Sequence, residues 1–408
     1  MFDTIKDHPN ASELSWLLVD GDLVETGGMD IANLRLAQFL ADHFPVQVVT
    51  HRADTSLSGH PNVQVERVKR PLNSHFLGGF FLDAAGRKVA RINQQLRPGL
   101  TKTIVNGGNC FVPGSINWVH YVHAAYSPHS TSRGLRRIKN VLHRRQALRS
   151  ERRGLTAASI VICNSHLTAK HVTELVGVPA ERVCVVYYGI DVDRFYPASE
   201  PERMELRQRL GWEADRPYLL FIGALGDQRK GFDSVASALE ILCREPNWDA
   251  NLVVVGSGAD KDHWERHFAK LGLKDRVSFL GFRRDVPDLL RAADALVAPT
   301  RYEAYGLGVH EAICCGLPTF VSRDSGVAER FPESLRARLL IEDPNDIDEL
   351  AVKLQNWQAN RGQYRSIVSS FCDSLRVRTW KHMAEEFVAR VQVDARVWSE
   401  NLVIPSEP

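Results

Sequence analysis

The sequence predicts an α/β protein with two domains, each built around a parallel sheet. Two observations carry this prediction. Short apolar runs alternate with segments of helical period along the 408 residues, and the alternation breaks once near the middle. Several runs are apolar on both faces, as buried parallel strands are. The composition, 44% hydrophobic and 25% charged, is that of an ordinary globular chain. We therefore expect two doubly wound, Rossmann-like domains that bind ligands in the cleft between them.

The individual elements follow from local patterns. In 30–44 and in 231–243, apolar side chains recur every three or four residues, which indicates helices with one buried face. Strands are expected wherever β-branched and apolar residues form a short run. In chain order these runs are 15–20, 46–51, 62–68, 102–106, 117–123, 159–164, 182–188, 217–223, 251–256, 276–280, 295–299, 317–322 and 337–341.

The break in the alternation divides the chain. Residues 191–216 are polar, contain two prolines and have no strand character, as an interdomain connection does. We therefore expect an N-terminal domain at 1–195, a linker at 196–216 and a second domain at 217–376. A helix and tail at 377–408 complete the chain.

Charge and composition exclude several classes of protein. With 51 Lys and Arg against 49 Asp and Glu, the net charge of +2 argues against a whole-chain polyanion binder. The longest apolar run is far shorter than the roughly 20 residues that span a bilayer. The polar, acidic first residues predict no signal peptide.

The odd number of cysteines (7) and the absence of CxxC favour reduced thiols in a cytosolic protein, without a metal site. No GxGxxG follows the first strand and no GxxxxGK[ST] occurs, which argues against a dehydrogenase and a P-loop NTPase.

The segment 295–320 is the most informative stretch. A strand ends there, Glu303 lies in the following loop, and Gly306 and Gly308 open a helix that carries Glu311. The free N–H groups and the dipole of a helix start suit a phosphate. Glu311, over a turn further along, could accept hydrogen bonds from ribose hydroxyls. Glu303 would face the group attached to the phosphate. An ordinary solvated loop with two surface glutamates is the alternative.

Other polar or glycine positions follow predicted strands. Gly27 and Gly28 form a second glycine turn at a helix start, suited to a phosphate or an acceptor hydroxyl. Strand alternation places His123 at the end of 117–123 and His120 three residues inside it.

Two further strand ends leave alternatives open. Gly256, in a Gly-x-Gly at a strand end, fits a tight turn as well as a ligand contact. Asn164 and Ser165 follow another strand where open sheets bind ligands, but we expect Ser165 to cap the helix that follows.

The motif E-A-Y-G-L-G-V-H-E at 303–311 resembles the E-x7-E signature of retaining nucleotide-sugar glycosyltransferases of family 4, which have the GT-B fold. The segments 159–197, 221–232 and 281–300 resemble the same family in the same order. The resemblance extends from residue 13 to about residue 390. It implies an acceptor-side N-terminal domain that faces a nucleotide-sugar-binding domain across a cleft. It also implies that the C-terminal helix returns to the N-terminal domain.

The resemblance implies catalytic roles for four side chains. Glu303 would contact hydroxyls of the donor sugar, and Lys230 would neutralise the diphosphate as the glycosidic bond breaks. The family pairs that lysine with an arginine just after the strand, where this chain has Gly223 and no arginine. Arg229 could substitute as a bidentate phosphate ligand. His123 resembles the family's active-site histidine, which packs against the donor sugar.

The resemblance also implies donor contacts. Glu311 would bind the ribose, and backbone groups would contact the sugar, the diphosphate and the base. The positions that match these backbone contacts, or that border the cleft, are Ala304, Tyr305, Gly306, Leu307, Gly27, Gly28, Gly223, Gly256, Phe282 and Arg283.

The implied activity is retaining transfer of a hexose-type sugar to an acceptor hydroxyl, in glycan, polysaccharide or glycolipid biosynthesis. The donor would be a nucleotide-diphosphate sugar, and neither a cofactor nor a metal is expected. The Asp191–Asp193 pair looks like the family's structural turn, not a metal site. Two alternatives stay open. One is another GT-B enzyme, such as a nucleotide-sugar epimerase or a phosphorylase. The other is a non-catalytic, membrane-associated scaffold.

A basic helix is predicted within 131–155. Nine Lys and Arg lie between residues 133 and 153, opposed only by Glu151, and an apolar stripe accompanies them. This pattern is typical of helices that lie on anionic membranes. The prediction is a cytoplasmic protein that can bind the inner membrane face and reach a lipid-linked acceptor; a solvated basic face is the alternative. No specific nucleic-acid binding is expected, because the stretch lacks aromatic stacking residues.

Overall fold

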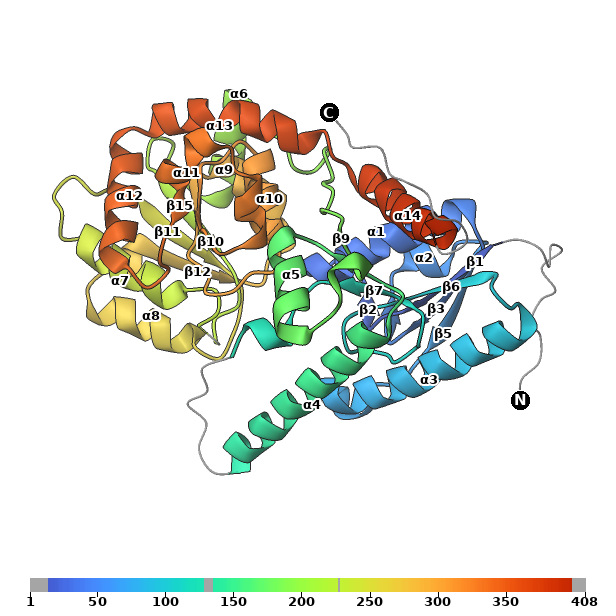
Figure 1. Cartoon of the computed structure of the whole chain (residues 1–408). Coiled ribbons are helices and arrows are strands. Elements are labelled where there is room, and N and C mark those ends of the chain that lie inside the picture. Colours follow the sequence, from blue (N-terminus) through green and yellow to red (C-terminus); the bar gives the residue numbers. More distant parts are fainter. Residues whose placement is uncertain (1–13, 128–134, 227, 398–408) are drawn as a thin grey trace.

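The computed structural model describes residues 14–127, 135–226 and 228–397. In these residues two α/β domains lie side by side, and the last helix returns from the second domain to the first (Figure 1). The first residues of the sequence, and Arg133 of the predicted basic helix, lie outside the described residues.

The N-terminal domain is built on a seven-stranded sheet in the order β5-β3-β1-β6-β7-β8-β9, in which every pair is parallel. Its strands are β1 (Ser15–Val19), β3 (Val46–Thr50), β5 (Val63–Arg67), β6 (Thr101–Val105), β7 (Ile116–Val119), β8 (Ile160–Cys163) and β9 (Val183–Val185). A small separate pair, β2 (Asp22–Leu23) and β4 (Arg52–Ala53), follows β1 and β3.

Side-chain alternation along these strands builds a core on each face of the sheet. Trp16 and Leu18 of β1 pack toward α1 (Gly28–His43), whereas Leu17 of β1 packs toward α3 (His75–Leu96). Helix α4 (Leu135–Ala157) packs Leu155 on the same side as α3, over β7 and β8. Both faces are therefore covered, as a parallel sheet requires.

The second domain has a six-stranded parallel sheet in the order β12-β11-β10-β13-β14-β15. Its strands are β10 (Tyr218–Ile222), β11 (Asn251–Val255), β12 (Val277–Gly281), β13 (Ala295–Ala298), β14 (Thr319–Ser322) and β15 (Leu340–Ile341). The helices around it are α7 (Phe232–Leu242), α8 (Lys261–Lys270), α9 (Val286–Ala292), α10 (Leu307–Cys314), α11 (Glu333–Leu339), α12 (Ile347–Ala359) and α13 (Arg361–Arg376).

The final helix, α14 (Trp380–Val397), packs against α1 of the N-terminal domain (Figure 1). At the crossing point, Ile190 forms a β-bridge with Thr379. A Cβ at Gly189 would lie 2.3 Å from the Thr379 carbonyl carbon, so only glycine allows this contact. Buried Trp380, Met383 and Phe387 then join the core beneath α1. Among the described residues, no helix is both long and apolar enough to cross a bilayer.

Most predicted strands lie within two residues of the observed ones, and three depart from them. Strand β7 ends at Val119, so the predicted strand 117–123 is wrong at its end, and His123 instead begins a 3-10 turn, η2 (His123–Ala125). Strand β9 stops three residues before the predicted end of 182–188. Only the last two residues of 337–341 form a strand, because Leu335 and Leu339 are buried on one side of α11.

The polar segment 196–216 contains a helix, α6 (Glu200–Leu210), which packs on α9 of the second domain. Arg203 and Arg207 of α6 are buried and both form ion pairs with Asp294. Arg207 also donates to three backbone carbonyls of residues 213–216. We expected segment 196–216 to be an interdomain linker, but its buried arginines anchor it to the second domain.

We predict that Asp294→Ala lowers the free energy of unfolding by about 3–5 kcal/mol, because it removes the buried carboxylate that Arg203 and Arg207 share and leaves Arg203 only its pair with the exposed Glu200. Urea denaturation checks this. The matched control is Glu213→Ala, which breaks the exposed pair with Arg216 and should cost less than about 1 kcal/mol. Equal effects of the two substitutions would contradict the anchoring role.

Candidate active site

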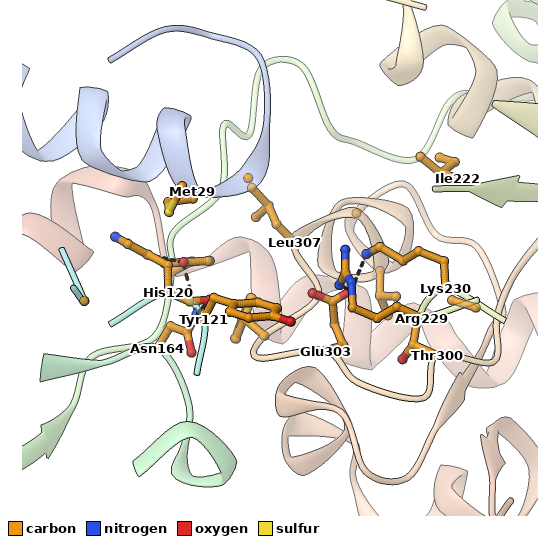
Figure 2. Close-up of a pocket in the computed structure, with 18 of the residues that line it drawn as sticks. Met29, His120, Tyr121, Asn164, Ile222, Arg229, Lys230, Thr300, Glu303 and Leu307 are labelled. Carbon is orange, nitrogen blue, oxygen red and sulfur yellow. Dashed lines mark hydrogen bonds and ion pairs between the residues drawn. The ribbon is translucent and has the colours of Figure 1, made fainter. Parts of the chain in front are cut away.

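A cavity of about 570 Å³ lies between the domains, at the carboxyl ends of both sheets (Figure 2). Residues directly after β6, β7 and β8 form one wall, and residues after β10 and β13 form the other. Its polar lining residues are Asn106, Asn109, His120, Tyr121, His123, Glu151, Asn164, Tyr188, Arg229, Lys230, Thr300, Glu303 and Tyr305.

The second domain contributes two cations and one carboxylate. Lys230 Nζ forms an ion pair with Glu303 Oε2, and Arg229 Nη1 lies 3.8 Å from the same oxygen (Figure 2). The neighbouring Gly231 makes this arrangement possible: a Cβ there would lie 1.9 Å from the Pro299 carbonyl oxygen. Lys230 is thereby held beside the loop that carries Glu303.

This loop ends in a helix start that is open to the cavity. Gly306 has a φ of 104° and precedes α10, and no side chain among the described residues caps the first N–H groups of that helix. Gly306, Leu307 and Gly308 all line the cavity. Uncapped N–H groups and the helix dipole, next to two cationic side chains, form a site that can bind an anion such as a phosphate.

The back of the loop is held by the N-terminal domain. The hydroxyls of Ser165 and Thr168 donate to the Ala304 carbonyl at 2.6 and 3.0 Å. Ser165 also caps α5 (His166–His171) by accepting from the Thr168 N–H, which confirms the cap predicted for it. From the second domain, Glu329 accepts hydrogen bonds from the N–H groups of His166 and Leu167.

The N-terminal wall contains a buried polar network. His120 is hydrogen-bonded to the Tyr188 hydroxyl at 2.5 Å and to Asn33 at 3.2 Å, and Asn164 donates to the same hydroxyl. Burial lowers the pKa of His120 to about 3, so the imidazole is neutral. This wall therefore presents neutral hydrogen-bonding groups, in contrast to the cationic wall opposite.

His123 is held in the cleft by a carboxylate on the basic helix. Glu151 of α4 is buried and accepts hydrogen bonds from the backbone N–H groups of His123 and Ala124, at 2.6 and 3.1 Å. It fixes the turn η2 and leaves the His123 side chain exposed at the cavity wall. The sequence showed Glu151 only as the single acidic residue among nine basic ones and gave no sign of this role.

The cavity brings together all four side chains predicted to be catalytic, Glu303, Lys230, Arg229 and His123. Predicted donor positions that also line it are Gly28, Tyr305, Gly306 and Leu307. Predicted positions that are not among its lining residues are Gly27, Ala304, Glu311, Gly223, Gly256, Phe282 and Arg283. The ligand contacts of both groups stay predictions.

Packing explains several positions outside the lining. A Cβ at Gly256 would lie 2.0 Å from the Gly223 carbonyl oxygen, so this glycine is needed where β10 and β11 end side by side. Arg283 pairs with Asp285 at the surface, and Phe282 is 63% exposed after β12. Phe282, Gly223 and Gly256 still lie at the carboxyl edge of the sheet that the prediction assigned to them.

Glu311 lies on α10 and has no hydrogen-bond or ion-pair partner among the described residues. Burial raises the pKa of this carboxyl to about 8, and the nearby Arg194 offsets only part of the effect. Such a carboxyl suits a ligand that brings its own hydroxyl donors, and its binding to ribose remains a prediction.

The sequence analysis assigned no individual site residue to part of the N-terminal wall. Residues 106–109, Asn-Gly-Gly-Asn, follow β6 and line the cavity. The signal was present, because they form a glycine-rich turn after a predicted strand, as Gly27 and Gly28 do. The contributions of Tyr121, Glu151 and Thr300 depend on tertiary contacts and left no local signal.

Two facing α/β domains with a positively charged, anion-binding site in the cleft between them are the features of the GT-B class of glycosyltransferase. Solved structures with this fold cover almost the whole chain. Sucrose-phosphate synthase from Thermosynechococcus elongatus has a TM-score of 0.75, 20% identity, and coverage of 95% of this chain and 100% of that one. Anabaena HepE in complex with UDP and glucose has a TM-score of 0.67, 20% identity, and coverage of 93% and 100%.

Family models match both halves of the sequence. The Glycosyltransferase Family 4 model matches residues 26–194, and the Glycosyl transferases group 1 model matches residues 202–370. The chain belongs to the glycosyltransferases that these two models describe, as the E-x7-E resemblance predicted.

Curated relatives include mannosylfructose-phosphate synthase of Agrobacterium fabrum, 28% identical over 246 residues, or 58% of this chain and 53% of that protein. A D-inositol 3-phosphate glycosyltransferase of Catenulispora acidiphila is 32% identical over 47% of this chain and 46% of that protein. The matches to these two relatives span about half of each relative's length. A 2-deoxystreptamine N-acetyl-D-glucosaminyltransferase of Streptomyces fradiae is 28% identical over 72% of this chain and 73% of that protein.

We predict that Glu311 makes stability fall as pH rises. The pKa of its carboxyl is about 8 in the folded chain, against 4.5 for an ordinary glutamate. The contribution of this proton uptake to the free energy of unfolding is therefore complete below about pH 4.5 and is lost as pH rises toward 8. The difference in unfolding free energy between Glu311→Gln and the wild type should therefore grow from pH 5 to pH 8. Urea denaturation at several pH values measures it. Glu333→Gln, at an 89% exposed side chain, is the control and should give a flat difference; a flat difference for Glu311→Gln would contradict the prediction.

Proposed function

We propose that this protein is a retaining glycosyltransferase that moves a hexose-type sugar from a nucleotide-diphosphate donor to an acceptor hydroxyl. One observation carries the proposal: Lys230, Arg229 and Glu303 form a charged cluster beside the uncapped start of α10, in the cavity between the domains. The reaction belongs to glycan, polysaccharide or glycolipid biosynthesis. A lipopolysaccharide core mannosyltransferase of Rhizobium meliloti and an O-antigen chain mannosyltransferase of Escherichia coli, both similar to this chain, support this assignment.

The cationic wall is suited to a leaving diphosphate. The phosphates would accept from the N–H groups of Leu307 and Gly308, while Lys230 and Arg229 balance the charge that develops on the leaving oxygen. Two side-chain cations and a helix dipole supply this compensation from the protein itself. We therefore propose that transfer needs neither a metal nor another cofactor, and that added chelator leaves turnover unchanged.

Both carboxylates in the cleft already have hydrogen-bond or ion-pair partners, and this supports retention of the anomeric configuration. Glu303 and Glu151 are the carboxylates among the described lining residues. Glu303 is paired with Lys230, and Glu151 accepts two backbone N–H groups, so neither is free to attack the sugar. We propose that a leaving phosphate oxygen takes the acceptor proton on the same face of the sugar, with Glu303 oriented toward sugar hydroxyls.

The neutral wall is suited to the sugar and the acceptor. His123 would pack against the donor sugar, and Asn106, Asn109 and Tyr121 offer groups for hydroxyl hydrogen bonds. Anabaena HepE is described in complex with UDP-glucose, so UDP-glucose is the first donor to test, followed by GDP- and ADP-sugars. Nucleotide release that requires an acceptor distinguishes transfer from epimerisation. Sugar release by inorganic phosphate would instead indicate a phosphorylase.

We also propose that the protein is cytoplasmic and binds the inner membrane face through α4 and the start of α3. Leu72 is 92% exposed, and Phe80 and Phe81 are each 52% exposed. The Phe76 ring stacks on His143 of α4 at 4.6 Å, which joins the two elements into one surface. Exposed basic residues of α4, Lys139, Arg145 and Arg149, lie on the same helix. Aromatic side chains next to basic ones match an anionic bilayer.

For the donor site, we predict that Lys230→Ala lowers kcat by about 10²–10³ because it removes a cation that stabilises the leaving group. Steady-state kinetics with the active nucleotide sugar measure this, and NMR of the product anomer tests retention. Lys261→Ala, at a partly exposed i,i+4 pair on α8, is the matched control and should retain full activity. Unchanged kcat in Lys230→Ala would remove the donor role and favour the scaffold alternative.

For the membrane surface, we predict that Arg145→Gln with Arg149→Gln weakens binding to phosphatidylglycerol vesicles by about 2 kcal/mol, or roughly 30-fold. Phe80→Ser with Phe81→Ser should weaken it further, and 0.5 M salt should act mainly on the electrostatic part. Cosedimentation measures binding. Val352→Ser, at another exposed apolar residue, is the control for the phenylalanines. Binding that is insensitive to both double substitutions would overturn this assignment.

A further inference from the structure

A second cavity, of about 680 Å³, lies at the opposite edge of the N-terminal sheet from the cleft. Its floor is formed by the first residues of β6, β7 and β8, and its sides are formed by α3 and α4. The loop segment 111–115 and Val391 of α14 close it. None of its lining residues belongs to the cleft cavity, so it is a separate site.

The charged residues that line this cavity are all cationic. Arg87 and Arg91 of α3, Lys102 of β6 and Arg153 of α4 line it, and its described lining includes no Asp or Glu. Arg87 is paired with Asp83 on its own helix, whereas the Arg153 guanidinium lies over the Phe111 ring, 3.8 Å from the centroid. Cations that converge from three elements in one hollow raise the local concentration of anions.

The cavity also has a buried hydroxyl and an apolar wall. Ser115 is 3% exposed, and its Oγ has no hydrogen-bond partner among the described residues. The apolar lining residues are Phe111, Val112, Pro113, Ile116, Ile160 and Val391.

From these features we propose that the cavity binds an organic phosphate, with its phosphate group on the arginines and its carbon skeleton against the apolar wall. Guanidinium groups bind phosphate oxygens in a bidentate manner. The source of the phosphate can be a soluble phosphate ester or the headgroup of an anionic lipid. This site goes beyond the proposed transfer reaction, and its occupancy can be measured without turnover.

Two elements connect this cavity to the cleft. The β6–β7 loop lines the cleft with residues 106–109 and the second cavity with residues 111–115. Helix α4 carries Arg153 in one and Glu151 in the other. The loop and the helix touch without spare room, since a Cβ at Gly108 would lie 2.7 Å from the Glu151 backbone nitrogen. A ligand that orders this loop and α4 therefore acts on the turn that Glu151 holds at His123.

The test is calorimetric titration of the full chain with fructose 1,6-bisphosphate and inorganic pyrophosphate, and cosedimentation with phosphatidylglycerol vesicles. The Lys230→Ala variant, which weakens the cleft anion site, should still bind a bisphosphate or the vesicles. Arg91→Glu with Arg153→Glu should weaken that binding at least tenfold. Lys381→Glu, at a 72% exposed side chain on α14, is a charge-reversal control and should bind like the wild type.

Hydrogen exchange provides a local readout that also serves if a variant is unstable. Bound fructose 1,6-bisphosphate should slow exchange at the amides of 107–115 in the wild-type chain and in Lys230→Ala. Binding of the soluble esters identifies a metabolite site. Vesicle binding that Arg91→Glu with Arg153→Glu lowers further in a chain already carrying Arg145→Gln with Arg149→Gln identifies a lipid headgroup, because the outer face of α4 is then already weakened. Absence of binding by all three probes, or binding that is lost in Lys230→Ala and kept in Arg91→Glu with Arg153→Glu, would overturn the proposal.

Discussion

The geometry of the cleft depends on one backbone carbonyl, that of Ala304. A buried carbonyl needs a hydrogen-bond donor, and here both donors, Ser165 and Thr168, come from the other domain. Gly326 completes the contact, because a Cβ there would lie 2.1 Å from the Ala304 oxygen and 2.7 Å from Ser165. The loop that carries Glu303 is therefore positioned by both domains together. A change in the domain arrangement would therefore also move Glu303.

This shared loop separates two different electrostatic environments. On one side, Lys230 and Arg229 concentrate positive charge around Glu303 and the start of α10. On the other, burial keeps His120 neutral within hydrogen bonds to Tyr188 and Asn33. A charged leaving group and neutral hydroxyl groups need these opposite environments within one cavity. The fold supplies them by placing the carboxyl ends of two parallel sheets face to face.

The sequence predicts what local patterns encode. Buried strands are short apolar runs, and the glycines at the helix start after Glu303 have a recognisable order, so both could be placed from the sequence. The resemblance to family-4 glycosyltransferases singled out Lys230, Glu303 and His123, and all three line one cavity. Asp294 beneath α6 and Ser165 on Ala304 could not be predicted, because each acts through a partner about 90 or more residues away. His123 was placed on a strand because its neighbours are apolar, whereas Glu151 stabilises a turn there.

Helix α4 shows why such distant contacts matter for function. Its exposed side carries the basic residues assigned to the membrane, and Arg153 lines the second cavity. Its buried Glu151 holds the backbone of His123 in the cleft. Helix α4 is stiff. A ligand bound at one of its surfaces would therefore affect the other two through small shifts of the whole helix. Gly108 and Gly154 let the β6–β7 loop follow such shifts closely, because each packs against backbone atoms with no side chain between. One helix thus links the surface where an acceptor would arrive to the turn where its hydroxyl would react.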